Sequence, residues 1–160
     1  GTFGPIDYAS RELPFGFTRY YDEELGTPLV RLFVAFRTLV DPQSLGRIKL
    51  ATNALEDEFR AGGPDMLVAP PGTRRSGPTT PRTVNLDPGL LSLGRFILAS
   101  TKAGPHRIAL AQGIYAELTL VYERCGFRAL PWTYPDYRSP GYRRMLEQVR
   151  ELYKRQRRAP

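Results

Sequence analysis

The sequence contains a single cysteine and a single histidine among its 160 residues. Cys125 therefore has no partner for an internal disulfide, which is typical of a reducing compartment and predicts a cytoplasmic protein. One thiol and one imidazole are too few for a tetrahedral structural zinc site, so zinc fingers are excluded and no metal site is expected. No apolar run approaches the roughly 18 residues that a membrane-spanning helix needs, so we expect no membrane partner.

Two further signatures are missing from the chain. It has no GxxxxGK[ST] loop to wrap phosphates with backbone amides, and no GxSxG elbow to mark a serine nucleophile.

The net charge of +7 is concentrated at one end, where residues 143–158 hold seven basic side chains against Glu147 and Glu151. The remainder is nearly balanced, so basicity alone is weak evidence for a nucleic-acid partner.

Hydrophobic periodicity predicts an α+β fold with a mainly antiparallel sheet. Asp41 and Pro42 give the cap and first-turn signal of a helix, and Asp87 and Pro88 repeat this signal. A third helix closes the chain with an apolar stripe and a basic remaining surface. Helices are therefore expected near residues 42–60, 88–99 and 140–157. A strand over residues 96–100 is the alternative to the second helix, because the period of a short apolar run is ambiguous.

Four segments have the composition of strands. Residues 29–40 alternate and predict a half-buried strand. One of its faces is apolar and consists of Val30, Leu32, Val34, Phe36 and Val40. Residues 106–110, 114–123 and 127–130 predict an antiparallel meander, because turn residues separate them.

The whole chain, residues 1–160, is expected to form one domain. Residues 61–82 contain nine Gly or Pro in 22 positions and predict a flexible surface loop. Along the helix that precedes this loop, Lys49, Asn53 and Glu56 indicate an ordinary polar stripe on the helix surface.

Several segments resemble a known family: VNLDPGLLSLGRFILASTK, HRIALAQGIYAELTLVYE and PWTYPDYRS, together with PFGFTRYYDEELG and IKLATNALEDEF. They are similar, over nearly the whole chain, to an uncharacterised bacterial family catalogued as a domain of unknown function, DUF4416. That family usually begins with a further apolar strand and an acidic helix before the segment matching FGPID. The resemblance implies that this strand-helix unit is missing here. The family has no established activity, so no catalytic residue follows from the resemblance.

A candidate binding segment follows the predicted helix near 88–99. Thr101, Lys102, His106 and Arg107 offer a hydroxyl, an ammonium, an imidazole and a guanidinium within seven residues. This set suits an anion, because lysine supplies a point charge and arginine a bidentate fork. The alternative is an ordinary polar turn in which Arg107 pairs with Glu117 or Asp136.

Three groups are candidates for proton transfer, namely His106, Glu117 and Asp136. An imidazole titrates close to neutral pH, and a carboxylate in the middle of a strand is expected to be partly buried and to need a partner. Trp132 and Tyr134 lie in a proline-rich strap that would offer stacking platforms to a base or a sugar. The alternatives are an ion pair for Glu117 and a cover over the core for the strap.

Three hypotheses about function follow. The first is a small protein that binds a phosphorylated, nucleotide or carboxylate small molecule through Thr101, Lys102, Arg107, Trp132 and Tyr134, with catalysis left open and no cofactor identified. The second is a module that binds RNA or a ribonucleoprotein through the basic C-terminal helix. The third is a structural or assembly partner without a small-molecule site, because an open sheet edge favours pairing.

Overall fold

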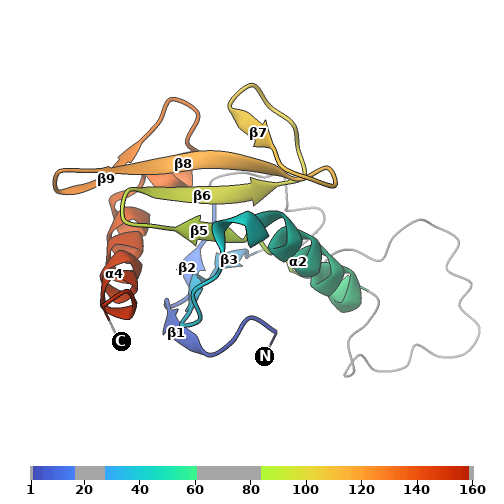
Figure 1. Ribbon diagram of the computed structural model, residues 1–160, viewed down its shortest axis with the longest axis horizontal. Helices are drawn as coiled ribbons and strands as arrows, with labels where there is room; N and C mark the ends of the chain where they lie inside the picture. Colours follow the sequence, from blue (N-terminus) through green and yellow to red (C-terminus); the bar gives the residue numbers. More distant parts are fainter. Residues whose placement is uncertain (1, 17–27, 61–83, 159–160) are drawn as a thin grey trace, which may run out of the picture.

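The computed structural model describes residues 2–16, 28–60 and 84–158, which form an α+β fold (Figure 1). The predicted fold class is confirmed, and the paired strands in the described part of the chain are antiparallel. A five-stranded sheet has the order β5-β6-β8-β7, and β9 also pairs with β8. Its strands are β5 (Gly89–Leu91), β6 (Arg95–Ser100), β7 (Arg107–Ala109), β8 (Tyr115–Glu123) and β9 (Gly126–Ala129). The loop predicted at 61–82 lies outside the described residues.

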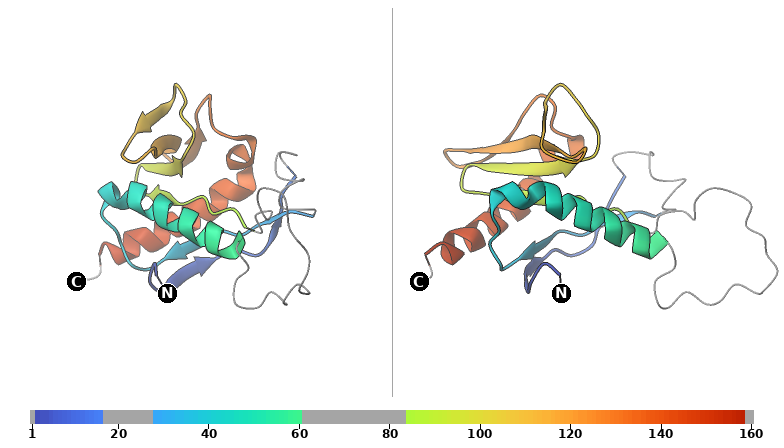
Figure 2. Two further views of the ribbon diagram at one scale, coloured as in Figure 1. Left: turned by 90° about the vertical axis from the view of Figure 1, so that its right-hand side faces the viewer. Right: turned by 45° about the vertical axis from the view of Figure 1, so that its right-hand side comes forward.

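Two long helices lie beneath this sheet in Figures 1 and 2. The helical elements are η1 (Pro42–Ser44), α2 (Leu45–Arg60), α3 (Pro135–Arg138) and α4 (Pro140–Gln156). The Asp41 carboxylate accepts a hydrogen bond from the Gln43 amide at 2.8 Å, and the Ser139 hydroxyl accepts one from the Tyr142 amide at 3.3 Å. Both helix starts therefore use a side-chain cap followed by proline. The helices predicted near 42–60 and 140–157 are confirmed.

The helix predicted near 88–99 is wrong, because this segment forms the hairpin of β5 and β6. Asp87 caps no helix, and its carboxylate accepts a hydrogen bond from the side-chain amide of Asn85 at 2.9 Å. The alternating residues of β6 pack into two different cores: Phe96 belongs to one buried cluster and Ala99 to the other. A strand that is buried on both faces reads as a continuous apolar run, so its period could not distinguish it from a helix.

The predicted meander is present as three strands but not as a simple row. β6 pairs with one edge of β8, while β7 and β9 pair one after the other along its opposite edge. On β8, the pairing with β7 ends at Glu117 and the pairing with β9 begins at Leu120. Leu118 and Thr119 therefore lie between the two paired segments. Thr119 is also left out of the β6 pairing by a register shift, which makes it the extra residue of a β-bulge.

Below the sheet lies a ribbon made of β1 (Ile6–Ala9) with β4 (Val34–Phe36) and of β2 (Leu13–Pro14) with β3 (Val30–Arg31). Two hydrogen bonds join its halves: the Ser10 amide donates to the Phe33 carbonyl at 2.9 Å, and the Phe33 amide donates to the Ser10 hydroxyl at 3.0 Å. We call residues 5–15 and 29–37 the ribbon.

The predicted orientation of residues 29–40 is inverted in the structure. Phe33 packs against the main core cluster and Arg31 is partly buried, whereas Val30, Leu32, Val34, Phe36 and Val40 are exposed. The inner face is polar at one position because Arg31 has a buried carboxylate partner, Asp136. Alternation therefore identified the two faces correctly but not which of them meets the core.

The core consists of two clusters of buried side chains. The larger one joins the sheet to α3 and α4 through the buried side chains of Phe96, Leu120, Phe127, Tyr137, Tyr142 and Leu146. The smaller one joins the sheet to α2 through Leu45, Ala99 and Ile114. The other face of β8 carries Glu117, which is covered by the loop before β7 and by the strap, residues 130–134.

Candidate functional site

Glu117 is the centre of the candidate site. It lies in the middle of β8 and is 2% exposed. Its Oε2 atom accepts hydrogen bonds from Arg107 Nε at 2.8 Å and from His106 Nε2 at 3.2 Å. We call Lys102, His106, Arg107, Glu117 and Trp132 the His106 site.

The local sequence explains why these groups meet. Arg107 and Glu117 are directly opposite in the β7–β8 pair, so their side chains share one face of the sheet. The Arg107 amide donates to the Gly104 carbonyl at 3.1 Å, and this turn places His106 next to the start of β7. Arg107 Nη1 donates to the Lys102 carbonyl at 2.9 Å and thereby holds the loop against the strand.

The contacts favour one tautomer of His106. An ionised carboxylate only accepts hydrogen bonds, so beside an ionised Glu117 the imidazole Nε2 is the atom that carries the hydrogen between the two groups. In the neutral ring the lone pair is then on Nδ1. Glu117 Oε1 is buried and has no hydrogen-bond partner among the described residues. The carboxylate thus orients His106 and keeps one unused acceptor.

Trp132 covers the imidazole. Its ring stacks on that of His106 with centroids 5.6 Å apart and planes inclined by 17°. The indole Nε1 donates to the Leu118 carbonyl at 2.8 Å, and the Thr133 hydroxyl donates to the Thr119 carbonyl at 2.6 Å. The strap is therefore attached to the two residues of β8 that lie between β7 and β9. Part of the indole stays exposed.

The structure brings together four of the predicted site residues, His106, Arg107, Glu117 and Trp132. Lys102 contributes its carbonyl and has an exposed side chain, and Thr101 is exposed in the same loop. Tyr134 is exposed at the end of the strap. Asp136 does not join this group, because it pairs with Arg31 at the start of α3.

Sequence reasoning missed this second cluster, which surrounds Arg31. The guanidinium pairs with Asp136 and lies 4.2 Å from the centre of the Phe15 ring. Burial opposes its charge, but the neighbouring Tyr137 and Asp136 raise the pKa of Arg31 overall. Burial also raises the pKa of Tyr137 and of Tyr142. Arg31 and Asp136 are 105 positions apart, and no motif joins them.

The stripe of Lys49, Asn53 and Glu56 was also misjudged. Lys49 and Glu56 are buried, and their Nζ and Oε1 atoms are 3.8 Å apart. Lys49 donates to the Leu86 carbonyl at 2.7 Å, and Glu56 accepts from the Leu86 amide at 2.7 Å. The two side chains hold the extended segment before β5 as a neighbouring strand would, so they are structural rather than a solvated surface.

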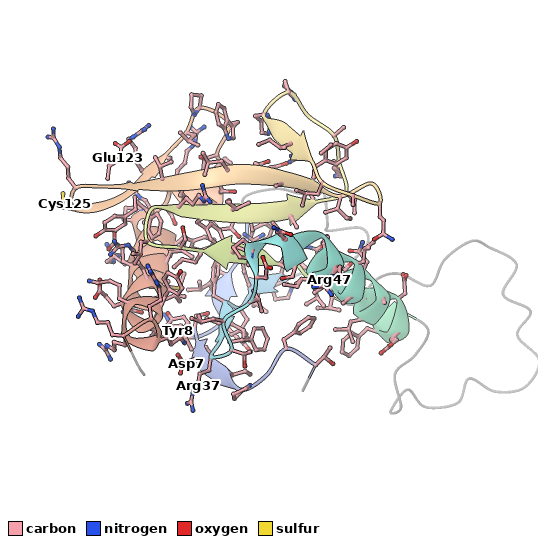
Figure 3. All side chains as sticks on the ribbon, in the orientation of Figure 1. Asp7, Tyr8, Arg37, Arg47, Glu123 and Cys125 are labelled. Carbon is pink, nitrogen blue, oxygen red and sulfur yellow. The ribbon has the colours of Figure 1, made fainter. Side chains whose placement is uncertain are left out.

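Other candidate features lie away from the His106 site. Cys125 is exposed at the tip of the β8–β9 hairpin (Figure 3). A hollow of about 250 Å³ lies beside it, between residues 125–127 and the start of α4. Within the described ranges, no group of three His, Cys, Asp or Glu side chains is arranged to hold a metal ion. In the same ranges, no helix has the length and apolar character needed to cross a membrane.

Comparison with known proteins gives one match. No curated protein and no solved structure matches the chain significantly. The model of a domain of unknown function, DUF4416, matches residues 1–153, which cover the ribbon, the sheet and most of α4. The chain therefore belongs to the DUF4416 family.

Proposed function

We propose that this protein binds an anionic small molecule at the His106 site and that His106 exchanges a proton with it. The observation that supports this proposal is the shared Oε2 atom of Glu117, which holds the imidazole by Nε2. A histidine fixed in this way presents Nδ1 as a base. Glu117 acts as a positioning residue, and His106 is the catalytic residue.

The charge of the site supports an anionic ligand. Lys102 and Arg107 are two cations of the site, and Glu117 pairs with Arg107. By formal charge, the residues of the His106 site contain more cations than anions even with a neutral imidazole. A phosphate or carboxylate near Lys102 would meet a favourable potential.

Trp132 supports a ligand with a planar part, such as a nucleotide. The indole is fixed at Nε1 by the Leu118 carbonyl and remains partly exposed. A fixed, partly exposed ring is a platform on which a base can stack without ordering the side chain first. The ligand we propose is therefore a phosphorylated or carboxylated molecule with a flat ring.

RNA binding is the second candidate, supported by the exposed rings of Trp132 and Tyr134 together with the basic α4. Several cations of α4 already have partners within the protein. Arg150 lies 3.6 Å from the centre of the Tyr122 ring, and Lys154 pairs with Glu151 at 2.9 Å. The strap and α4 also lie on different sides of the sheet (Figure 1), so one RNA strand would have to pass around the sheet in order to contact both. The small-molecule site is therefore the better-supported proposal.

Thermal unfolding with a panel of probes tests the first proposal. Phosphate, pyrophosphate, AMP, ADP and citrate are each added to the wild type, to Lys102→Ala and to Lys154→Ala. A probe at about 100 times its Kd stabilises the folded state by about 2.7 kcal/mol. We expect this stabilisation to be lost in K102A and kept in K154A, which removes the same charge from α4.

Two results would argue against this proposal. If no probe stabilises the wild type, or if K102A and K154A respond alike, the anion does not bind at the His106 site.

RNA binding is measured separately by filter binding across a salt series, where a steep loss of affinity is the signature of phosphate contacts. A flat salt series would reject the RNA candidate.

A further inference from the structure

The outer face of the ribbon is apolar at every paired position. The register places Ile6 opposite Phe36, Ala9 opposite Val34 and Pro14 opposite Val30. Opposed residues in an antiparallel pair share a face, so these side chains form one surface. We define the outer face of the ribbon by the following exposed residues: Ile6, Ala9, Pro14, Val30, Leu32, Val34 and Phe36.

This surface is exposed, although the opposite face of the same segment packs against the core. The exposed fractions are 58% for Ile6, 57% for Val30, 53% for Leu32, 39% for Val34 and 38% for Phe36. On the inner face, Phe33 makes an edge contact with Tyr142 at 4.9 Å between ring centroids. A segment that packs one face on the core and carries apolar side chains on the other has the composition of a strand between two layers, and the described residues supply only the inner layer.

We propose that a second copy of this chain covers the outer face of the ribbon. The seven residues of the outer face leave roughly 500 Å² exposed per copy, so a symmetric pair buries about 1,000 Å² from them, which reaches the size expected of a specific interface. The defined face contains no charged side chain, and homodimer interfaces are more apolar than transient ones.

A two-fold arrangement suits this face. In a symmetric dimer the same patch meets itself, and the seven residues of the outer face carry no charge, so they create no like-charge contact across the axis. The exposed charged residues of the ribbon, Arg11, Glu12 and Arg37, are not among the seven. Two twisted ribbons also pack face to face with interdigitating side chains, as the sheets of a β-sandwich do. The charged pair of Arg37 and Asp7 lies at the end of the ribbon (Figure 3), and Figure 2 shows β1 and β4 side by side.

Sedimentation velocity over a concentration series in the micromolar range tests this proposal, with a reductant present so that Cys125 forms no disulfide between molecules. We expect a dimer for the wild type and a monomer for Val34→Lys. Ile108→Lys is the matched control, because Ile108 is 70% exposed on β7 and lies outside the ribbon. It should remain dimeric. Circular dichroism confirms that each variant is folded.

If Val34→Lys does not fold, the double variant with Val30→Thr and Val34→Thr replaces it, because threonine keeps the shape and the strand preference of valine. We then expect the dimer dissociation constant to rise at least tenfold. A wild type that is monomeric at every concentration, or folded ribbon variants that dimerise like the wild type, would overturn the proposal. The Lys102→Ala variant should stay dimeric, so loss of ligand binding and loss of dimerisation are separate results.

Discussion

Glu117 and Arg107 stand opposite each other in the β7–β8 pair, with the guanidinium Nε 2.8 Å from the carboxylate Oε2. The same strand carries a second pair, Glu123 with Arg128, joined at 2.7 Å and 2.8 Å. The first pair is buried and the second has both side chains 54% exposed. The two pairs therefore differ mainly in their access to water.

Glu117→Gln should lower the free energy of unfolding by about 3–5 kcal/mol, because it leaves the buried Arg107 without its counter-charge. Glu123→Gln is the matched control on the same strand, and we expect little change from it, because water already solvates that pair. Urea unfolding of both variants gives the comparison. Equal effects would show that burial does not govern the Glu117 pair.

The tautomer of His106 is a second prediction. The chain has one histidine, so the ¹⁵N resonances of its ring are assigned without ambiguity. Long-range ¹H–¹⁵N spectra should show Nε2 carrying the hydrogen in the neutral wild type and a weaker preference in Glu117→Gln. A wild-type ring with the hydrogen on Nδ1 would contradict the positioning role of Glu117.

The buried tyrosines predict loss of stability at high pH. Burial raises the pKa of Tyr137 and Tyr142 above the ordinary value of 10.0. Above that pH the unfolded chain releases these protons and the folded chain retains them, so stability falls as pH rises, at up to about 1.4 kcal/mol per pH unit for the buried Tyr137. Urea unfolding at several alkaline pH values measures this slope. Tyr137→Phe should make it shallower, and an unchanged slope would contradict the assignment.

The pair of Lys49 and Glu56 should be strongly coupled. Lys49→Met leaves a buried carboxylate beside Leu86 and should cost about 3 kcal/mol or more of the free energy of unfolding. Replacing both residues, with Glu56→Leu as the second change, should cost less than the two single changes added together. A double-mutant cycle by urea unfolding measures the difference, and additive effects would argue against the clamp.

Local signals predicted the elements that depend on neighbouring residues. Asp41 and Pro42 marked a helix start that the structure confirms, and of the two partners considered for Arg107, Glu117 and Asp136, the structure pairs it with Glu117. Asp87 and Pro88 showed the same signal but begin no helix, since the Pro88 carbonyl accepts from the Ala99 amide at 3.0 Å within the β5–β6 hairpin. Pairing in the sheet outweighed the local preference.

What the sequence did not reveal depends on distant partners. Arg31 meets Asp136, and Lys49 meets the backbone of Leu86, only after the ribbon, α2 and α3 have packed. Arg31 can lie on the inner face of the ribbon because Asp136 pairs with it there. Hydrophobic periodicity alone does not reveal such a distant partner. Buried charges paired across the fold are therefore the class of residue that pattern analysis overlooks.

The side-chain attachment of the strap has a consequence for motion. Trp132 and Thr133 bind the carbonyls of Leu118 and Thr119 through an indole and a hydroxyl, not through a strand-to-strand ladder. The strap can therefore open without unpairing β8 from β6, β7 or β9, and such an opening costs less than global unfolding. Amide hydrogen exchange should register the strap as a unit that opens before the sheet.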